Sequence, residues 1–418
     1  MMNRRDFVKS VFAAPLLGAA APAVAEGRLS QAVGKPLPPW KAGEFQIHFI
    51  YTGVAESQFW IMPDGTTMLL DCGDHPAYTR GKMALWLLPN GKRHAGEWIA
   101  RYVARVNPHG KDVDYMMISH HHADHAGTDG WGGFLQAAET LKFRRGFDRG
   151  WPDFDEPIPN ERCDNQSYPH IRKTLDCLVE RDGLKMEKFR VGAVNQVAML
   201  RNAADYPGFS VTNIAGNGKI LCRDGGIRDL YAEKRGAKHL NENAMSLGVV
   251  AQYGAFRYYT AGDFFDRFHL KDGSVCRIEA ELAKEIDPVD VAKVNHHGHH
   301  SMSLPLVAAL RARVWTACVW DTLHVTSDTL ERLASREAYP GPRLVAPGLF
   351  SPLRRLEDAG KPFMSDIAPE SFDAGHVVVT VSADGDAYSV AYVTADDESM
   401  RVTGAYSFRP TPPENRLS

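Results

Sequence analysis

Residues 116–130 of the chain read MMISHHHADHAGTDG and place four histidines and an aspartate within six positions. On a tight loop that leaves a strand, His120 and His122 can converge on one cation, while Asp124 and His125 turn to a second. Imidazole nitrogens and a carboxylate oxygen suit Zn²⁺ and other borderline divalent ions. A solvated histidine-rich loop is the alternative, but it does not explain Asp124 or the polar candidates that follow other strands. The segment therefore predicts a metal site.

Strand-like segments precede each of these polar candidates. DYMMIS (114–119) runs directly into the histidines, TMLLDCGD (67–74) carries Asp71, and YYTAGD (258–263) ends at Asp263. VAKVNHHGHH (291–300) presents His296 and His297 after a fourth such segment. Loops at strand ends hold reactive side chains on a rigid edge. We therefore expect the chemistry to lie on the rim of a sheet.

Hydrophobic periodicity predicts the elements that carry these loops. Residues 45–49 alternate as in a strand, residues 58–74 and 249–263 read as hairpins, and residues 96–106 form an apolar helical stripe. A helix at 304–312, a strand at 313–320 and three strand-like runs within 376–408 follow. Residues 141–242 are rich in Arg, Asp, Pro and Gly and show no clear pattern.

The motif His120-x-His122-x-Asp124-His125 resembles the H-x-H-x-D-H motif of the metallo-β-lactamase superfamily, hydrolases with an αββα sandwich. Asp71 is similar to the strand-end aspartate that precedes this motif, and Asp263 resembles the aspartate that bridges two metals. The histidines of KVNHHG resemble the last ligand motif. The resemblance covers residues 45–300 and implies an α/β fold, an αββα sandwich over residues 44–350. Residues 351–418 are expected to add extra C-terminal β-strands packed on the same domain.

Within this superfamily, the chain is similar to the competence-protein (DNA-uptake) group. Asn243 and Ser246 match its Asn-x-x-Ser-hydrophobic run, which is followed by a Gly-Asp and a His-His-Gly. The group includes the hydrolase-like domain of DNA-uptake proteins and secreted phosphodiesterase-type enzymes.

The resemblance implies a ligand set for one or two zinc ions, or for another divalent metal: His120, His122, Asp124, His125, Asp263 and His297. We favour His297 over His296 because it directly precedes Gly298, and the reverse assignment stays open. Many members place a further histidine between the main motif and the bridging aspartate. Here only His170 and His239 lie in that interval, neither in a matching context. Occupancy by a single metal therefore stays open.

Asp71, Asp124 and His296 complete the predicted catalytic set. A hydroxide held at the metals, its pKa lowered toward neutrality, would attack carbon or phosphorus. Asp71 would hold the ligand cluster, or the hydroxide, by hydrogen bonds. Asp124 would bind the second metal, and His296 would protonate the leaving group. The expected substrate is a phosphodiester or another small ester. A β-lactamase or lactonase, a non-catalytic metal-binding protein and di-iron redox chemistry are the alternatives.

The N-terminus predicts export. Asn3–Ser10 (NRRDFVKS), an apolar run and Ala23-Val24-Ala25 indicate a twin-arginine signal peptide over residues 1–25, hence a partnership with that export machinery and a periplasmic location. Residues 26–43 read as a linker rich in proline and glycine. No long apolar run lies elsewhere, which argues against a membrane span in the mature chain. Removing residues 1–25 changes the formal net charge from −3 to about −5, which disfavours nucleic acid as the main substrate.

Several further residues carry weaker predictions. Arg149 and Trp151, in DRGWPDFDEP, either contact substrate or stabilise a turn. His324 is a substrate-side candidate, and His299 and His300 are expected at the surface or near substrate rather than on a metal. The six cysteines lack any C-x-x-C spacing and predict no cysteine-ligated zinc site; Cys163 and Cys177 are the nearest pair.

Overall fold

The computed structural model describes residues 27–75, 85–164, 167–194, 196–231, 240–265, 268–269 and 275–412. The predicted signal peptide and His239 lie outside these residues. No helix in the described ranges is long and apolar enough to cross a membrane. The five cysteines whose side chains are described, Cys72, Cys163, Cys177, Cys222 and Cys318, are free thiols.

Two large sheets dominate the described part of the chain. The first has ten strands, in spatial order β1 (Gly27–Arg28), β22 (Val402–Phe408), β21 (Tyr388–Thr394), β20 (Gly375–Val381), β2 (Phe45–Phe49), β3 (Ser57–Ile61), β4 (Thr67–Cys72), β5 (Asp112–Met117), β6 (Lys142–Asp148) and β8 (Lys185–Lys188). The second has eight strands, in spatial order β11 (Ile227–Asp229), β10 (Lys219–Leu221), β9 (Phe209–Gly216), β13 (Gly248–Tyr253), β14 (Phe256–Thr260), β17 (Val291–Lys293), β18 (Val314–Ala317) and β19 (Leu344–Pro347). Two short strand pairs, β7 (Cys163–Asp164) with β12 (Leu240–Asn241) and β15 (Phe268–His269) with β16 (Val275–Cys276), lie outside these sheets.

The core lies between the two sheets because their strands bury side chains on both faces. In β4, Met68 and Leu70 pack in the cluster between the sheets, whereas Leu69 packs on the helical side. From the second sheet, Val211 and Tyr258 enter the same central cluster. Strands buried on both faces read as continuous apolar runs, as the sequence of β4 does.

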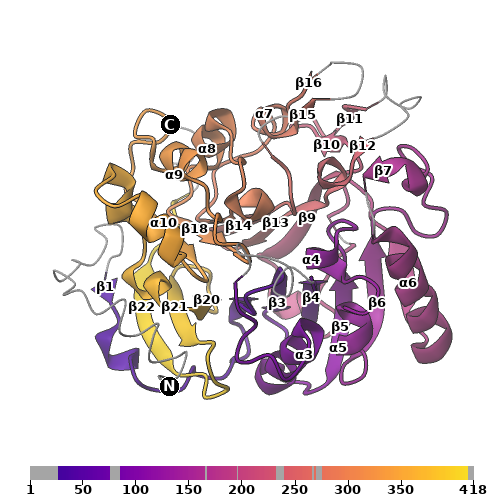
Figure 1. The fold of residues 1–418 in the computed structure, drawn as a ribbon, viewed down its shortest axis with the longest axis horizontal. Helices are drawn as coiled ribbons and strands as arrows, with labels where there is room; N and C mark the ends of the chain where they lie inside the picture. The colour runs from indigo at the N-terminus through magenta and orange to yellow at the C-terminus, as the bar shows by residue number, and fades with distance from the viewer. Residues whose placement is uncertain are drawn as a thin grey trace, which may run out of the picture.

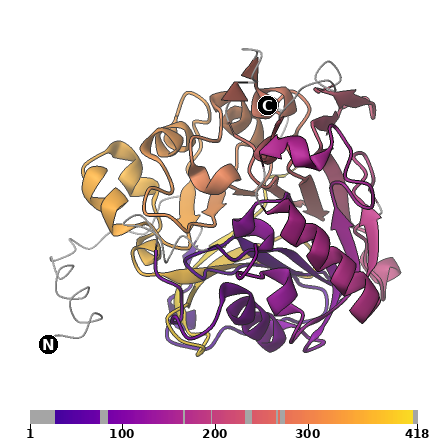
Figure 2. The same ribbon diagram turned by 45° about the vertical axis from the view of Figure 1, so that its right-hand side comes forward.

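Helices cover the outer face of each sheet. The first sheet carries α3 (Ala95–Val106), α5 (Phe134–Ala137) and α6 (Tyr168–Asp182), while the turn α4 (Ala123–Ala126) lies at its rim. The second sheet carries α7 (Ile278–Leu282), α8 (Leu304–Leu310) and α9 (Ser327–Ala334), and α10 (Pro352–Glu357) contacts α9 through Arg354 and Ser327. The two helical layers lie on opposite sides of the molecule (Figures 1 and 2). The layer order is αββα, which confirms the predicted fold class.

Single-turn 3₁₀ segments connect several of these elements. They span Ser30–Ala32, Asn160–Arg162, Ala203–Asp205, Glu242–Met245, Asn295–Gly298, Pro362–Asp366 and Pro369–Phe372. The segment Asn295–Gly298 carries His296 and His297.

The C-terminal strands extend the first sheet. β20 pairs antiparallel with β2, from Phe45 opposite Val381 to Phe49 opposite Val377, and β21 and β22 continue the sheet outward. In Figure 1 these yellow strands lie beside the indigo N-terminal strands. Edge strand β1 pairs with β22.

Parallel pairing brings the loops of interest to one edge. β4 pairs with β5, and β14 pairs with β17, each in parallel. The carboxyl ends of parallel strands meet at the same edge of a sheet, where ligand sites form in α/β proteins. Asp71 lies near the end of β4, and the loops after β5, β14 and β17 carry the histidine motif, Asp263 and His297.

Candidate metal centre

Two glycines allow the loops to approach one another closely. At Gly73, a Cβ atom would lie 1.8 Å from the carbonyl oxygen of Asp124, so only glycine lets the end of β4 contact the histidine motif. Gly262 has φ +49°, and its Cβ would lie 2.8 Å from the side chain of Ser246. Glycine adopts positive φ without strain and has no side chain, so it meets both requirements. Asp71 and Asp263 are therefore placed by their glycine neighbours.

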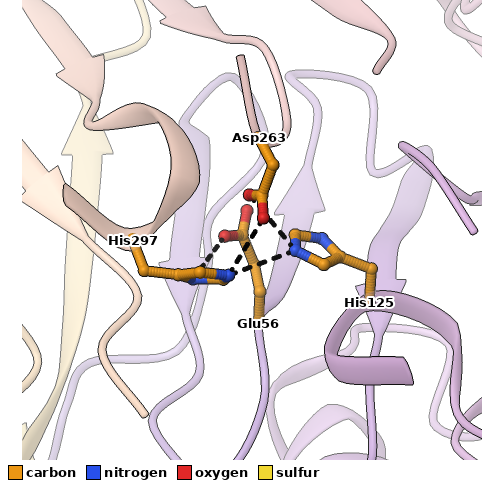
Figure 3. Close-up of side chains that lie close together, drawn as sticks. All are labelled: Glu56, His125, Asp263 and His297. Atoms are coloured by element: carbon orange, nitrogen blue, oxygen red, sulfur yellow. Dashed lines mark hydrogen bonds and ion pairs between the residues drawn. The ribbon is translucent and has the colours of Figure 1, made fainter. Parts of the chain in front are cut away.

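Four buried side chains converge between the two sheets: Glu56, His125, Asp263 and His297 (Figure 3). One ligand atom from each lies within 4.8 Å of the others. The Nε2 atom of His125 is 3.2 Å from Asp263 Oδ1 and 3.3 Å from His297 Nε2. The Nε2 atom of His297 is 3.2 Å from Asp263 Oδ2. Imidazole nitrogens and carboxylate oxygens this close form a chelating donor set.

Asp124 approaches the same two imidazoles and suits the fourth position better than Glu56. Its Oδ2 atom is 2.9 Å from His297 Nε2 and 3.8 Å from His125 Nε2. Tetrahedral zinc with bonds of 2.0–2.2 Å separates its ligand atoms by about 3.3 Å. The distance between the two imidazole nitrogens and the distances from them to the carboxylate oxygens, 2.9–3.8 Å, lie on either side of that value. The donor set Asp124, His125, Asp263 and His297 therefore fits a divalent ion.

Glu56 has a different partner, because its Oε2 atom lies 2.8 Å from the ammonium of Lys293. Lys293 is fully buried and also donates to the carbonyl of Gly262 at 2.6 Å. Burial lowers the pKa of Lys293, but the Glu56 and Asp263 carboxylates outweigh it and raise the pKa above its usual value. This buried ion pair neutralises Glu56, which leaves Asp124 and Asp263 as the anionic ligands.

Hydrogen bonds orient the two cluster histidines. His125 Nδ1 donates to Asp71 Oδ2 at 2.7 Å, and His297 Nδ1 donates to the Cys318 carbonyl at 2.9 Å. Asp71 also accepts the backbone N–H and the hydroxyl of Ser119, each at 2.7 Å. Such outer partners fix the tautomer and aim Nε2 at the metal. Asp71 is therefore not a member of the donor set but orients His125 within it.

His120 and His122 form a second, smaller group. Their Nε2 and Nδ1 atoms are 3.1 Å apart, and His120 Nε2 is 3.8 Å from Asp263 Oδ2. Asp263 therefore reaches both groups, as a bridging carboxylate would. His170 lies elsewhere on α6, beside Asp129 and Thr174.

His296 points away from the cluster that His297 enters. Its Nε2 atom accepts a hydrogen bond from Asn243 Nδ2 at 3.1 Å, and its Nδ1 atom is enclosed without a partner among the described residues. Both histidines adopt positive φ, +49° and +54°, which turns the two successive rings apart. Burial lowers the pKa of His296 to about 4. Its role as proton donor stays a prediction.

The two residues of the Asn-x-x-Ser run hold parts of the site. Asn243 bonds His296, and the Ser246 hydroxyl accepts the backbone N–H of Asp263 at 3.0 Å. Beside Asn243, Glu242 forms a buried pair with Arg149, with contacts of 2.7 and 2.8 Å. Glu242 also accepts the backbone N–H of His121 at 2.9 Å. Arg149 is therefore a structural residue of the histidine loop rather than a substrate contact.

The sequence patterns missed three charged residues of this region: Glu56, Lys293 and Glu242. Each is fully or almost fully buried, at 1 %, 0 % and 0 % exposure. The sequence did contain one signal for such a pair, because Lys293 is a charged residue inside an apolar run. Charged residues are almost never fully buried unless they are paired.

Carboxylates set the protonation of the cluster. Burial lowers the pKa of His297, but Asp263 and Asp124 outweigh it and raise the pKa to about 9. Burial also lowers the pKa of His125, but the Asp263 and Asp71 carboxylates outweigh it and raise this pKa well above its usual value. The metal-free histidines are therefore charged at neutral pH, and this stabilising charge is lost from His297 as pH rises through about 9.

Metal binding should release protons for this reason, since a metal takes a neutral imidazole. At about pH 7 we expect the release of about two protons per bound ion, from His125 and His297, and a smaller release above about pH 9. Isothermal titration of zinc in buffers of different ionisation enthalpy measures this number. Release of no proton at neutral pH would contradict the assignment of these two rings as ligands.

A cavity of about 550 Å³ opens beside the cluster. Asp124, Asp263 and His297 line it on the metal side, and His299, Trp320 and His324 line another wall. The arrangement gives a small molecule direct access to the donor set.

Residues 51–181 match the family model of the metallo-β-lactamase superfamily. This segment contains Asp71 and the whole histidine motif; Asp263 and His297 lie beyond it. A search of curated proteins finds no match. One similar solved structure is described as a protein of unknown function from Enterococcus faecalis V583. It is 12 % identical with a TM-score of 0.30; the match covers 60 % of this chain and 49 % of that one, so the chain spans about half its length.

The matched segment lies in an αββα sandwich with extra C-terminal strands, the metallo-β-lactamase fold. Together with the buried histidine and carboxylate cluster, it fits a metal-dependent hydrolase, and the donor set suggests a divalent metal.

Proposed function

We propose that the chain is a periplasmic zinc-dependent hydrolase that acts on a phosphodiester or another small ester. The observation that carries this proposal is the convergence of His125, Asp263 and His297 beside an open cavity, with Asp124 2.9 Å from His297 Nε2. The likeness of Asn243 and Ser246 to the competence-protein group supports the phosphodiester class. The twin-arginine pattern of residues 1–25 supports export.

When bound, the divalent ion would lower the pKa of a coordinated water and polarise the scissile bond. The residues of the chain do the positioning. Asp71 orients His125, and the Cys318 carbonyl orients His297. Asp263 reaches both histidine groups, and the buried Lys293 lies 3.8 Å from its Oδ1 atom. His120 and His122 offer a second ion-binding position next to the first.

Replacing Asp124 with asparagine tests this proposal, because it removes one anionic ligand and little volume. We expect zinc content to fall and kcat/KM on bis(4-nitrophenyl) phosphate to drop about 100-fold or more, since even outer partners of metal ligands are worth 10–100-fold. Asp129→Asn is the matched control, because Asp129 is 83 % exposed and five residues away.

Zinc content and turnover should be measured on the same samples of mature protein. Equal zinc and equal activity in Asp124→Asn and wild type would overturn the ligand assignment. Zinc binding by wild type without hydrolysis would overturn the phosphodiester class, and panels of lactams and lactones would then be tested.

A further inference from the structure

One wall of the cavity is a set of rings built on the loop after β18. The His324 ring stacks on that of His297, with centroids 5.2 Å apart and planes 14° apart. The Trp320 ring lies 5.1 Å from His324 and 5.7 Å from His297. These two residues therefore contact a ligand histidine directly and face the space beside the donor set.

The polar groups of this wall have no protein partner among the described residues. Both ring nitrogens of His324 lack a hydrogen bond although the side chain is only 5 % exposed, and Nδ1 is fully enclosed. The indole Nε1–H of Trp320 is likewise enclosed and unbonded, which leaves His324 Nε2 as the nitrogen of this wall that is open to the cavity. By contrast, His125 and His297 each use their second nitrogen within the protein. Buried donors are nearly always satisfied, so an unpaired one that is open to a cavity is available to a ligand.

The chemistry of the cavity selects among the proposed substrates. An acyl ester has one carbonyl oxygen, which the metal would polarise, and no anionic oxygen left for the ring wall. A phosphodiester has two non-bridging oxygens that share a negative charge. One can face the metal position while the other accepts hydrogen bonds from the wall. Hydrogen bonds to a charged acceptor are the stronger kind.

We propose that His324, held in place by the Trp320 ring, forms a subsite whose Nε2 atom binds a non-bridging oxygen of a phosphodiester. The subsite rests on the proposed hydrolase function and deepens it, because it names the substrate class that the cavity prefers.

The experiment uses the full mature chain loaded with zinc and two readouts. Binding of diethyl phosphate, a slowly reacting phosphodiester, is measured by isothermal titration calorimetry. Hydrolysis of bis(4-nitrophenyl) phosphate is compared with hydrolysis of the neutral ester 4-nitrophenyl acetate. The variants are His324→Phe, which keeps a stacked ring, His324→Gln, which keeps an amide donor, and Trp320→Phe. His300→Gln is the matched control, since the His300 side chain is 65 % exposed and pairs with Asp328.

For His324→Phe we expect the Kd for diethyl phosphate and the KM for the phosphodiester to rise about 10–100-fold. Zinc content, kcat within a few-fold and acetate hydrolysis should match wild type. Trp320→Phe should act in the same direction, and His324→Gln should recover part of the loss. The control should behave as wild type.

The subsite would be overturned by unchanged Kd and KM in His324→Phe, or by an equal loss of hydrolysis of the neutral ester. Loss of zinc in His324→Phe would also overturn it, by making His324 a metal residue. If wild type binds diethyl phosphate through His324 but hydrolyses no diester, the subsite stands and the proposed function fails.

Discussion

Replacing Lys293 with methionine should lower the free energy of unfolding of the metal-free chain by about 3–5 kcal/mol. The Lys293 ammonium is fully buried and lies 2.8 Å from Glu56 Oε2, which is itself 1 % exposed. Methionine fills a similar volume but leaves the Glu56 carboxylate without its counter-charge. Removing one partner of a buried ion pair is costly because the remaining charge stays desolvated.

The size of this loss should depend on pH. Burial raises the pKa of Glu56, and Lys293 acts against that rise. Without the lysine the carboxyl group takes up a proton more readily in the folded chain than in the unfolded one. The variant should therefore lose less stability at about pH 5 than at about pH 8. Urea denaturation in the presence of a chelator measures both values.

A second variant isolates the ion pair from packing effects. Glu56→Gln combined with Lys293→Met removes both charges, and it should recover most of the lost stability, because replacing both partners is often close to neutral. Lys284→Met is the control, since that side chain is 59 % exposed, and it should change stability by less than about 0.5 kcal/mol. A loss below about 1 kcal/mol in Lys293→Met would mean that the pair is solvated in solution.

Arg149→Met should also lower the free energy of unfolding by about 3–5 kcal/mol. It should in addition weaken zinc binding. The Arg149 guanidinium forms two contacts with Glu242, at 2.7 and 2.8 Å, with no exposure of either side chain. Glu242 accepts the backbone N–H of His121, which lies between His120 and His122. Without Arg149, the charge on Glu242 is unpaired and the loop of the two histidines loses its support.

We expect zinc affinity at the His120 and His122 position to fall about 10–100-fold in this variant, as for other outer-shell changes. Arg149→Lys should rescue little, because lysine cannot form the two-point contact. Arg149→Met with Glu242→Gln should regain stability, since glutamine keeps an acceptor for His121. Arg144→Met, on the strand β6 that ends just before Arg149, is the control, because the Arg144 side chain is 62 % exposed. Unchanged denaturation midpoints and unchanged zinc titrations in Arg149→Met would contradict this account.

Local sequence determined much of the framework. Alternation of apolar residues predicted β2, and apolar runs with turn residues predicted the hairpins β3–β4 and β13–β14. The stripe of Ile99, Tyr102 and Val103 predicted α3. These signals are readable because each element has one dominant period and packs on a continuous core. The histidine motif is readable too, since its ligand types stand within six positions.

Residues 141–242 were unreadable for a physical reason. β6 has charged residues at several positions and buries no single alternating set. The loops that follow it are held by the Arg149 network, which includes bonds to Asn217 and Glu242, both far from Arg149 in sequence. Glu242, for example, lies 93 positions from Arg149. No local period records such a contact.

The types of the candidate ligands were therefore determined by the sequence itself, and their grouping only by the tertiary structure. Nothing local distinguishes His296 from His297; the backbone at both has positive φ, and the Cys318 carbonyl and Asn243 select which ring enters the cluster. Nothing local pairs Glu56 with Lys293, since Glu56 directly precedes β3 of the first sheet and Lys293 ends β17 of the second. Convergence of charges from distant strands depends on how the two sheets pack, and packing is a property of the whole chain.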